Sequence, residues 1–272
     1  MFQQRLRERS EKQNTRLCLG LDPRLAAHGS FEQMKRQTLA VLEGVAPHAA
    51  CVKPQAAFYE AMGLQGIEFM IELMRLARTL DLPVLLDAKR GDIGSTAEAY
   101  AQAWMTGEHA GNALTVNPYL GFETLRPFVD AGRKNGGGVF VLVKTSNPGS
   151  KDLQDLSTPD GLLAEVVAKA LDSLGAEEGE GLSSVGAVVG ATHPAELKKF
   201  RDLMPRATLL LPGLGAQGAK AEDLVDAFHE DGSGAVVSAS RGIQYASADL
   251  GVEAAVQAAI RFKDQLNQAA QK

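Results

Sequence analysis

The segment 87–92, Asp-Ala-Lys-Arg-Gly-Asp, holds the densest group of residues able to do chemistry in this chain. Asp87 and Lys89 are two residues apart at the end of an expected strand, so their side chains should point to the same side. Lys53 ends the preceding expected strand and should lie beside them. A strand-end salt bridge on a solvated rim is the simpler alternative. An alternating array of Lys and Asp is costly to hold near a core, however. We therefore interpret these residues, together with Asp92, as a functional network.

A glycine-rich turn is the second candidate site. Gly213, Gly215 and Gly218 match G-x-G-x-x-G between an expected strand and an expected helix, a pattern that alone suggests dinucleotide binding. That fingerprint also needs an acidic residue at the end of the next strand, which here ends in Ser-Ala-Ser-Arg. Backbone N–H groups at such a turn can instead bind a phosphate, and Arg241 can grip it with two hydrogen bonds. We interpret the turn as a phosphate site; the alternative for Arg241 is an ordinary surface guanidinium.

These residues need a scaffold that brings strand ends together. Eight short apolar runs alternate with segments of helical period, as where Ile67, Met70 and Met74 fall on one helix face. Runs that are apolar throughout are typical of strands covered on both faces. The pattern predicts one closed (β/α)₈ TIM barrel, an α/β fold forming a single domain over residues 1–272, with a doubly wound open sheet as the alternative. The expected strands are Leu17–Leu21, Ala50–Lys53, Val84–Ala88, Ala113–Val116, Gly138–Lys144, Val185–Gly190, Thr208–Leu211 and Ala235–Ser238.

In such a barrel the active site lies where the strands run out into the following loops. The polar residues of this chain follow that rule, because they stand at or just after the ends of the expected strands. We therefore expect them to converge on one rim. These residues are Asp22, Lys53, Asp87, Lys89, Asn117, Thr145, Ser146, Ser240 and Arg241.

Composition and charge exclude several classes of protein. The 272 residues carry 28 Lys and Arg against 33 Asp and Glu, a formal charge of −5, so we expect no binding of nucleic-acid polymers. No apolar run reaches the roughly 18 residues of a membrane span, and residues 1–16 lack the apolar segment of a secretory signal. The 5 histidines show no metal-ligand spacing. Cys18 and Cys51 lie in apolar runs, so we interpret them as buried thiols in a reducing cytoplasm.

The chain resembles orotidine 5′-phosphate decarboxylases along nearly its whole length. The most specific segment is 87–96, Asp-Ala-Lys-Arg-Gly-Asp-Ile-Gly-Ser-Thr. One departure is segment 237–241, Val-Ser-Ala-Ser-Arg, where the family pattern has an Asn before Ser-Ser-Arg; this departure leaves Arg241 intact. The segment 145–149, Thr-Ser-Asn-Pro-Gly, resembles that of the longer bacterial subgroup of this family. Supporting segments are 52–55 (Val-Lys-Pro-Gln), 116–119 (Val-Asn-Pro-Tyr), 144–149 (Lys-Thr-Ser-Asn-Pro-Gly) and 212–218 (Pro-Gly-Leu-Gly-Ala-Gln-Gly).

The resemblance implies a decarboxylation of orotidine 5′-phosphate to uridine 5′-phosphate, the last step of pyrimidine synthesis, without cofactor or metal. It also implies a homodimer in which each active site borrows residues from the partner. The residues it implies are Lys53, Asp87, Lys89 and Asp92 for the charged network; Asp92 and Thr96 for the neighbouring subunit's site; Asp22 and Lys53 for the ribose hydroxyls; Ser146 for the pyrimidine amide edge; and Gln217 and Arg241 for the phosphate, with Pro212 also binding substrate.

The implied reaction explains why a lysine should stand among carboxylates. Loss of CO₂ from C6 of the pyrimidine leaves an electron pair in the ring plane, which the ring's π system cannot delocalise. A fixed positive charge at C6 must stabilise that pair, and the ammonium of Lys89 can then donate the proton. Asp87 and Asp92 would keep Lys89 cationic. Asp87 would also, as a secondary effect, crowd the departing carboxylate.

Three other functions stay open at the level of sequence. A Mg²⁺-dependent sugar-phosphate lyase or aldolase shares the Asp-x-Lys-x-x-Asp loop, although segments 145–149 and 215–218 disfavour it. A Schiff-base aldolase would use Lys89 as a neutral amine, which its Asp neighbours disfavour. A non-catalytic sensor of phosphate ligands would have no need of the charged network.

Overall fold

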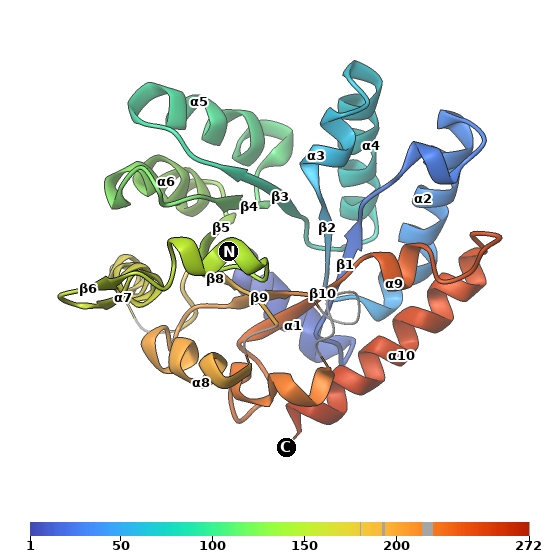
Figure 1. Ribbon diagram of the computed structural model, residues 1–272. Coiled ribbons are helices and arrows are strands. Elements are labelled where there is room, and N and C mark those ends of the chain that lie inside the picture. Colours follow the sequence, from blue (N-terminus) through green and yellow to red (C-terminus); the bar gives the residue numbers. More distant parts are fainter. Residues whose placement is uncertain (180, 192–193, 214–219, 272) are drawn as a thin grey trace.

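The core of the chain is a closed barrel of eight parallel strands, seen almost along its axis in Figure 1. The computed structural model describes residues 1–179, 181–191, 194–213 and 220–271. The strand order is β2-β1-β10-β9-β8-β5-β4-β3, and parallel bridges from Val52 to Val84 and from Gln55 to Asp87 close the ring. The barrel strands are β1 (Leu17–Leu21), β2 (Cys51–Pro54), β3 (Leu85–Arg90), β4 (Ala113–Val116), β5 (Gly138–Lys144), β8 (Val185–Val189), β9 (Leu209–Pro212) and β10 (Ala235–Ala239).

The predicted (β/α)₈ barrel is confirmed, and the open doubly wound sheet is wrong. Strands β1, β4 and β5 have the predicted bounds, and the other five differ by one or two residues. The apolar runs could be located because barrel strands are covered on both faces: side chains of β1, β4, β8 and β10 are buried along their whole length.

Helices surround the barrel (Figure 1), and their buried apolar side chains belong to the core cluster that includes the strands. In α4, for example, Phe69, Met70, Leu73 and Met74 are buried at helical spacing. No helix in the described part of the chain is long and apolar enough to cross a membrane. The helices are α1 (Phe2–Lys12), α2 (Phe31–Val45), α3 (Ala56–Glu60), α4 (Leu64–Thr79), α5 (Gly94–Met105), α6 (Arg126–Lys134), α7 (Leu163–Ala176), α8 (Pro194–Leu203), α9 (Arg241–Gln244) and α10 (Val252–Ala270).

Shorter elements fill the connections. Between β9 and β10 the described residues form a 3₁₀ helix, where the sequence pattern predicts an α-helix. A small antiparallel hairpin lies in the long connection between β5 and α7. These elements are η1 (Leu25–Ala27), η2 (Ala46–His48), η3 (Gly107–His109), η4 (Phe122–Leu125), η5 (Pro148–Asp152), η6 (Ala221–Ala227), β6 (Ser157–Thr158) and β7 (Gly161–Leu162).

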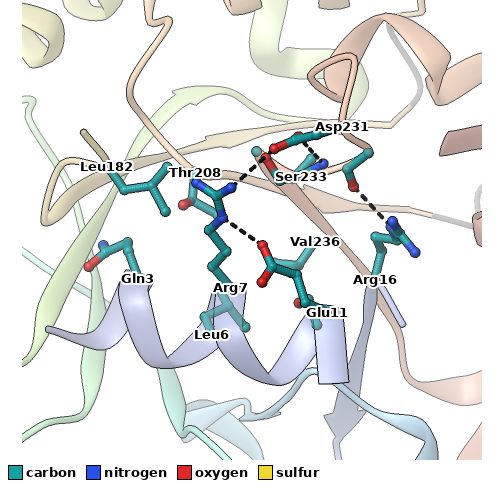
Figure 2. A pocket seen from close by; sticks show the side chains of 14 residues that line it. Gln3, Leu6, Arg7, Glu11, Arg16, Leu182, Thr208, Asp231, Ser233 and Val236 are labelled. Carbon is teal, nitrogen blue, oxygen red and sulfur yellow. Dashed lines mark hydrogen bonds and ion pairs between the residues drawn. The ribbon is translucent and has the colours of Figure 1, made fainter. Parts of the chain in front are cut away.

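Helix α1 closes the amino end of the barrel. Phe2 and Leu6 are buried there, and the ring of Phe2 meets Phe140 edge-on at 6.0 Å. Cys18 of β1 lies opposite Cys51 of β2 in the strand register, and both belong to the same interior cluster. Both are free thiols, and both are buried as predicted. A small cavity of about 40 Å³ lies on one side of α1 (Figure 2), and a cavity of about 230 Å³ lies between α1 and residues 78–83. Both cavities are smaller than the one at the carboxyl end of the barrel, which is about 480 Å³.

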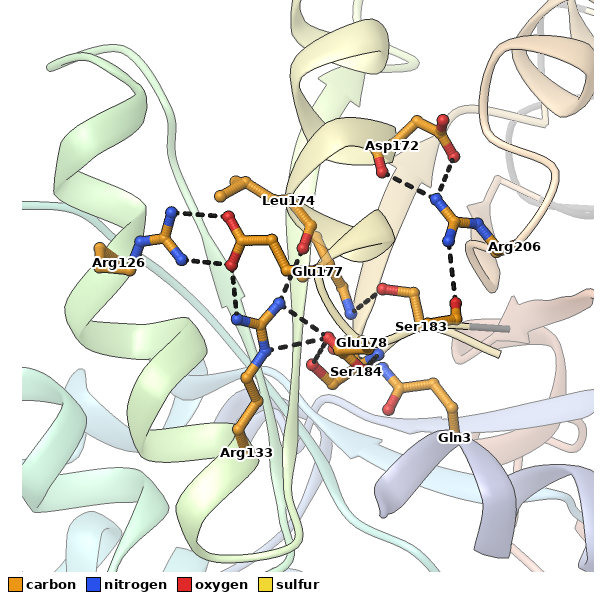
Figure 3. Close-up of polar contacts among 12 residues, drawn as sticks. Gln3, Arg126, Arg133, Asp172, Leu174, Glu177, Glu178, Ser183, Ser184 and Arg206 are labelled. Atoms are coloured by element: carbon orange, nitrogen blue, oxygen red, sulfur yellow. Dashed lines mark hydrogen bonds and ion pairs between the residues drawn. The ribbon is translucent and has the colours of Figure 1, made fainter. Parts of the chain in front are cut away.

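Ion pairs on the outside tie the helices to one another away from that carboxyl end. Arg133 of α6 binds Glu177 at 2.9 Å and Glu178 at 3.0 Å just beyond α7 (Figure 3). Hydrogen bonds from Arg126 and Arg133 lower the pKa of Glu177 to about 2. Glu178 also accepts a hydrogen bond from the backbone N–H of Ser184 at 2.8 Å. The network thus anchors the chain where it enters β8, although exposed ion pairs add little stability.

Candidate active site

A cavity of about 480 Å³ opens at the carboxyl end of the barrel. It collects polar side chains from the ends of most barrel strands, while Leu142, Val188 and Leu210 form its apolar base. Seven of the ten site residues that the family resemblance implies line it together. These are Asp22, Lys53, Asp87, Lys89, Ser146, Pro212 and Arg241.

The carboxylate of Asp87 is the centre of the site. Lys53 Nζ lies 3.0 Å from its Oδ2, and Lys89 Nζ lies 2.6 Å from its Oδ1. Gln55 Nε2 also donates to Oδ2 at 3.0 Å, and the hydroxyl of Thr115 donates to Oδ1 at 3.0 Å. Two ammonium groups and two neutral donors therefore hold one carboxylate in a single orientation.

The two lysines differ in their exposure to the cavity. The side chain of Lys53 is 6% exposed, whereas that of Lys89 is 43% exposed. Burial lowers the pKa of Lys53, but Asp87 and Asp22 raise it by more, so this pKa lies above its ordinary value. Burial likewise raises the pKa of Asp87, but Lys53 and Lys89 bring it well below the usual range. Lys53 and Asp87 thus favour each other's charged form, and Lys89 is the more exposed member of the network.

The backbone around Lys89 departs from a regular strand. Leu86 pairs with Leu114, but the next pair is Arg90 with Val116, so four steps along β3 oppose two along β4. Lys89 lies in this bulge with a left-handed φ of 49°, which costs a residue with a side chain about 1–2 kcal/mol. The contact between Asp87 and Lys89 is as expected, but a bulged backbone produces it. Strain of this kind is common where side chains are aimed at a ligand.

Asp22 has an unused acceptor beside the cavity. Its Oδ1 is buried and has no hydrogen-bond partner among the described residues. Its backbone N–H donates to Gln244 Oε1 at 2.9 Å, and its carbonyl accepts from the Tyr245 hydroxyl at 3.3 Å. Helix α9 and the residue after it thus fix the position of this carboxylate. A buried acceptor without a partner is costly, and a ligand hydroxyl would relieve that cost.

The loop after β5 carries Ser146 and Asn147 into the cavity wall. Thr145 N–H donates to Gln154 Oε1 at 2.8 Å, and Gln154 Nε2 donates to Thr145 Oγ1 at 2.8 Å. The buried ammonium of Lys144 pairs with Asp155. The polar stretch between β5 and α7 is therefore fastened to the barrel rim, which holds Ser146 at the cavity.

The opposite wall is formed by the ends of β9 and β10. Pro212 ends β9 and Gly213 follows it, and Arg241 begins α9 with an exposed side chain. Gly20 lies against Ser240: a Cβ at Gly20 would be 2.0 Å from the Ser240 hydroxyl oxygen. Gln217, Gly215 and Gly218 lie outside the described residues. Of the predicted phosphate site, the structure thus describes Arg241 and the start of the glycine turn.

Two predicted site residues do not meet the others within one chain. Asp92 is not part of the cavity lining, and its Oδ1 accepts a hydrogen bond from Ile93 N–H at 2.8 Å. Thr96 is exposed in the first turn of α5. Conversely, Gln55 and Thr115 touch Asp87 but were not among the predicted residues. Their only sequence signal is a polar residue in or directly after an apolar strand.

The described residues contain no group of three or more His, Cys, Asp or Glu side chains suited to a metal ion. What the cavity offers instead is a cationic side chain on a fixed anion, a free buried carboxylate oxygen and an exposed guanidinium across from them. This arrangement suits a ligand that carries hydroxyls and at least one anionic group.

Comparisons with known proteins agree with this geometry. The sequence model of the orotidine 5′-phosphate decarboxylase / HUMPS family matches residues 15–257. An orotidine 5′-phosphate decarboxylase of Deinococcus radiodurans is 58% identical over 269 residues, covering 98% of this chain and 97% of the relative. One of Rhodopirellula baltica is 41% identical and covers 84% of this chain and 83% of its own length. A solved structure of the OMP decarboxylase of Leishmania donovani has a TM-score of 0.84 at 36% identity, covering 100% of this chain and 99% of that chain.

Proposed function

The chain belongs to the orotidine 5′-phosphate decarboxylase family, and from this membership we propose how its rim residues work. The reaction is the decarboxylation of orotidine 5′-phosphate to uridine 5′-phosphate and CO₂ in pyrimidine synthesis, which makes the chain a carboxy-lyase. We propose that it proceeds without a cofactor, with Lys89 as the proton donor. The observation that carries this proposal is the Lys89 ammonium, held 2.6 Å from the fixed Asp87 carboxylate and exposed to the cavity.

In the proposed step the bond between C6 and the carboxylate breaks, and its electron pair stays on C6 while CO₂ leaves. The ammonium of Lys89 stabilises that pair and then transfers one proton to C6. The resulting neutral amine recovers its proton from solvent. Asp87 contributes by aiming the ammonium, because its Oδ1 binds Lys89 while Lys53 and Gln55 hold its Oδ2.

Electrostatic stabilisation by one ammonium cannot supply the whole acceleration. Two unit charges about 4 Å apart attract by about 4 kcal/mol at an effective dielectric near 20, which corresponds to about three decades of rate. The remainder must come from binding energy at other parts of the substrate. We assign the phosphate to Arg241, which lines the cavity together with Pro212, and to Gln217. The ribose hydroxyls go to Asp22 and Lys53, and the pyrimidine amide edge to Ser146.

We also propose that the working unit is a homodimer. Asp92 and Thr96 do not line the cavity of their own chain, which leaves them available to the active site of a second copy. Exposed apolar side chains surround this face: Ile93 is 62% and Tyr119 is 74% exposed. Tyr119 lines an apolar groove of about 560 Å³ that shares Leu142 with the catalytic cavity. Large exposed apolar patches next to a site are typical of subunit interfaces.

We propose that residues 1–272 act as one catalytic domain and that the protein works in the cytoplasm. The two free, buried cysteines are compatible with a reducing compartment. The substrate is a nucleotide, and the acidic net charge of −5 argues against nucleic-acid polymers as partners.

The absorbance change of orotidine 5′-phosphate, followed with purified, chelator-treated protein, tests the proposed function. We expect turnover to persist in EDTA, with release of one CO₂ for each uridine 5′-phosphate formed. Turnover that disappears in EDTA and returns with Mg²⁺ would favour the metal-dependent lyase. Trapping of substrate on Lys89 by borohydride would favour the Schiff-base aldolase.

A further inference from the structure

Thr115 connects the two central residues of the site without lining the cavity itself. It lies in β4 and is fully buried. Its hydroxyl donates to Asp87 Oδ1 at 3.0 Å and accepts from the backbone N–H of Lys89 at 2.8 Å. The directions of both bonds are fixed, because a carboxylate only accepts, an N–H only donates and a hydroxyl has one proton.

These bonds complete a ring that begins and ends at Lys89. The Lys89 ammonium binds Asp87 Oδ1 at 2.6 Å, the same oxygen that Thr115 binds, and Thr115 in turn holds the Lys89 N–H. The backbone and the side-chain end of one residue are therefore tied together through a single hydroxyl. Lys89 is also the residue of the β3 bulge with a φ of 49°, a conformation that persists only when its surroundings enforce it.

We propose that the Thr115 hydroxyl is a positioning group for the proton donor, an inference that rests on the function proposed above. It holds Lys89 in its left-handed conformation and fixes the oxygen against which the ammonium rests. Without the hydroxyl, the Lys89 N–H and Asp87 Oδ1 each lose a partner, and the ammonium has more orientations open to it. Substrate binding depends on other walls of the cavity, so the loss should appear in kcat and not in KM.

Replacement of Thr115 by Val, which has nearly the same shape without the hydroxyl, tests this inference. We expect Thr115→Val to lower kcat about ten- to a hundredfold, the range for a hydrogen bond to a charged group. KM for orotidine 5′-phosphate should stay within about threefold. Thr115→Ser keeps the hydroxyl and should keep kcat within about threefold of wild type. The matched control is Thr208→Val, because Thr208 is a buried threonine at the small cavity beside α1 (Figure 2); its kcat should be unchanged.

The possible results distinguish a failure of the positioning role of Thr115 from a failure of the proposed function. An inactive wild-type protein contradicts the proposed function and the inference together. An active wild type with an equally active Thr115→Val protein contradicts the inference alone, as does an equal loss of kcat in the Val and Ser variants. If the Val variant does not fold, Thr115→Ser and Thr115→Ala form a second pair that differs by one hydroxyl. Equal kcat in that pair overturns the inference as well.

Discussion

Lys53 Nζ and Lys89 Nζ bind different oxygens of one carboxylate, at 3.0 Å and 2.6 Å from Asp87. Both lysines line the cavity, but the side chain of Lys53 is buried and that of Lys89 is partly exposed. The two lysines therefore have different roles. Lys53 keeps Asp87 ionised and in place, and Lys89 presents the exposed charge. This division leads to opposite predictions for the two lysines.

Replacing Lys89 by Ala should abolish catalysis and spare the fold. We expect kcat/KM to fall by at least about three decades, because the charge that stabilises C6 is lost. The free energy of unfolding in urea should change by less than about 1 kcal/mol, since Lys89 is partly exposed. Lys53→Met should instead destabilise the protein by about 3–5 kcal/mol, because it breaks a buried ion pair. A near-normal kcat in the Lys89→Ala protein would contradict the role of Lys89 as the proton donor.

The stability of the protein should depend on the ionisation of Asp87 in acid. Its pKa in the folded chain lies below that of an unfolded Asp, about 4. The ionised carboxylate therefore contributes stability that is fully present above that value and is lost as the pH falls toward the lowered pKa. Wild type should thus exceed Asp87→Asn in unfolding free energy at about pH 7, and the gap should narrow at about pH 3. A gap that stays constant between these pH values contradicts this assignment.

Arg241→Ala should weaken substrate binding through the phosphate. We expect KM for orotidine 5′-phosphate to rise about ten- to a hundredfold, the loss typical of a charged hydrogen-bond pair. Orotidine, which lacks the phosphate, is the matched control substrate. Wild type and variant should have similar kcat/KM for orotidine if the two partners interact only with each other. An unchanged KM for the phosphorylated substrate would exclude Arg241 from the phosphate site.

Mixed dimers test whether active sites are shared. Lys89→Ala and Asp92→Asn proteins should each be nearly inactive on their own. If Asp92 serves the partner's site, a mixed dimer holds one intact site and one doubly altered site. Equal mixing with full exchange should then restore about a quarter of wild-type activity. No recovery from two inactive parents, with exchange verified by mass spectrometry of the dimers, would place Asp92 in its own subunit's site. An Asp92→Asn protein that is active on its own would place Asp92 outside both sites.

Much of the fold follows from local pattern. A barrel strand buried on both faces is apolar throughout, and this property marks β1, β4 and β5 in the sequence. The rim residues follow from the same logic, because every parallel strand ends on one side of the barrel. The sequence therefore predicts that Asp22, Lys53 and Arg241 converge on one rim, and all three line the cavity there.

What could not be predicted depends on pairing between distant segments. The bulge at Lys89 arises from the register of β3 against β4, which sequence spacing does not contain. Thr115 reads as a strand former in an apolar run, and only its position opposite the bulge gives its hydroxyl two partners. Gln55 can donate its hydrogen bond to Asp87 because the two residues are bridged where the end of β2 meets β3 and closes the barrel. Asp92 and Thr96 do not line the cavity of their own chain, and only the proposed dimer gives them a role.

A crystal structure with bound uridine 5′-phosphate would test the central claim most directly. The account predicts Lys89 Nζ within about 3.5 Å of C6 of the pyrimidine, the distance of a reactive contact, with the phosphate at Arg241. A nucleotide bound in the cavity with Lys89 turned away from C6 would contradict it.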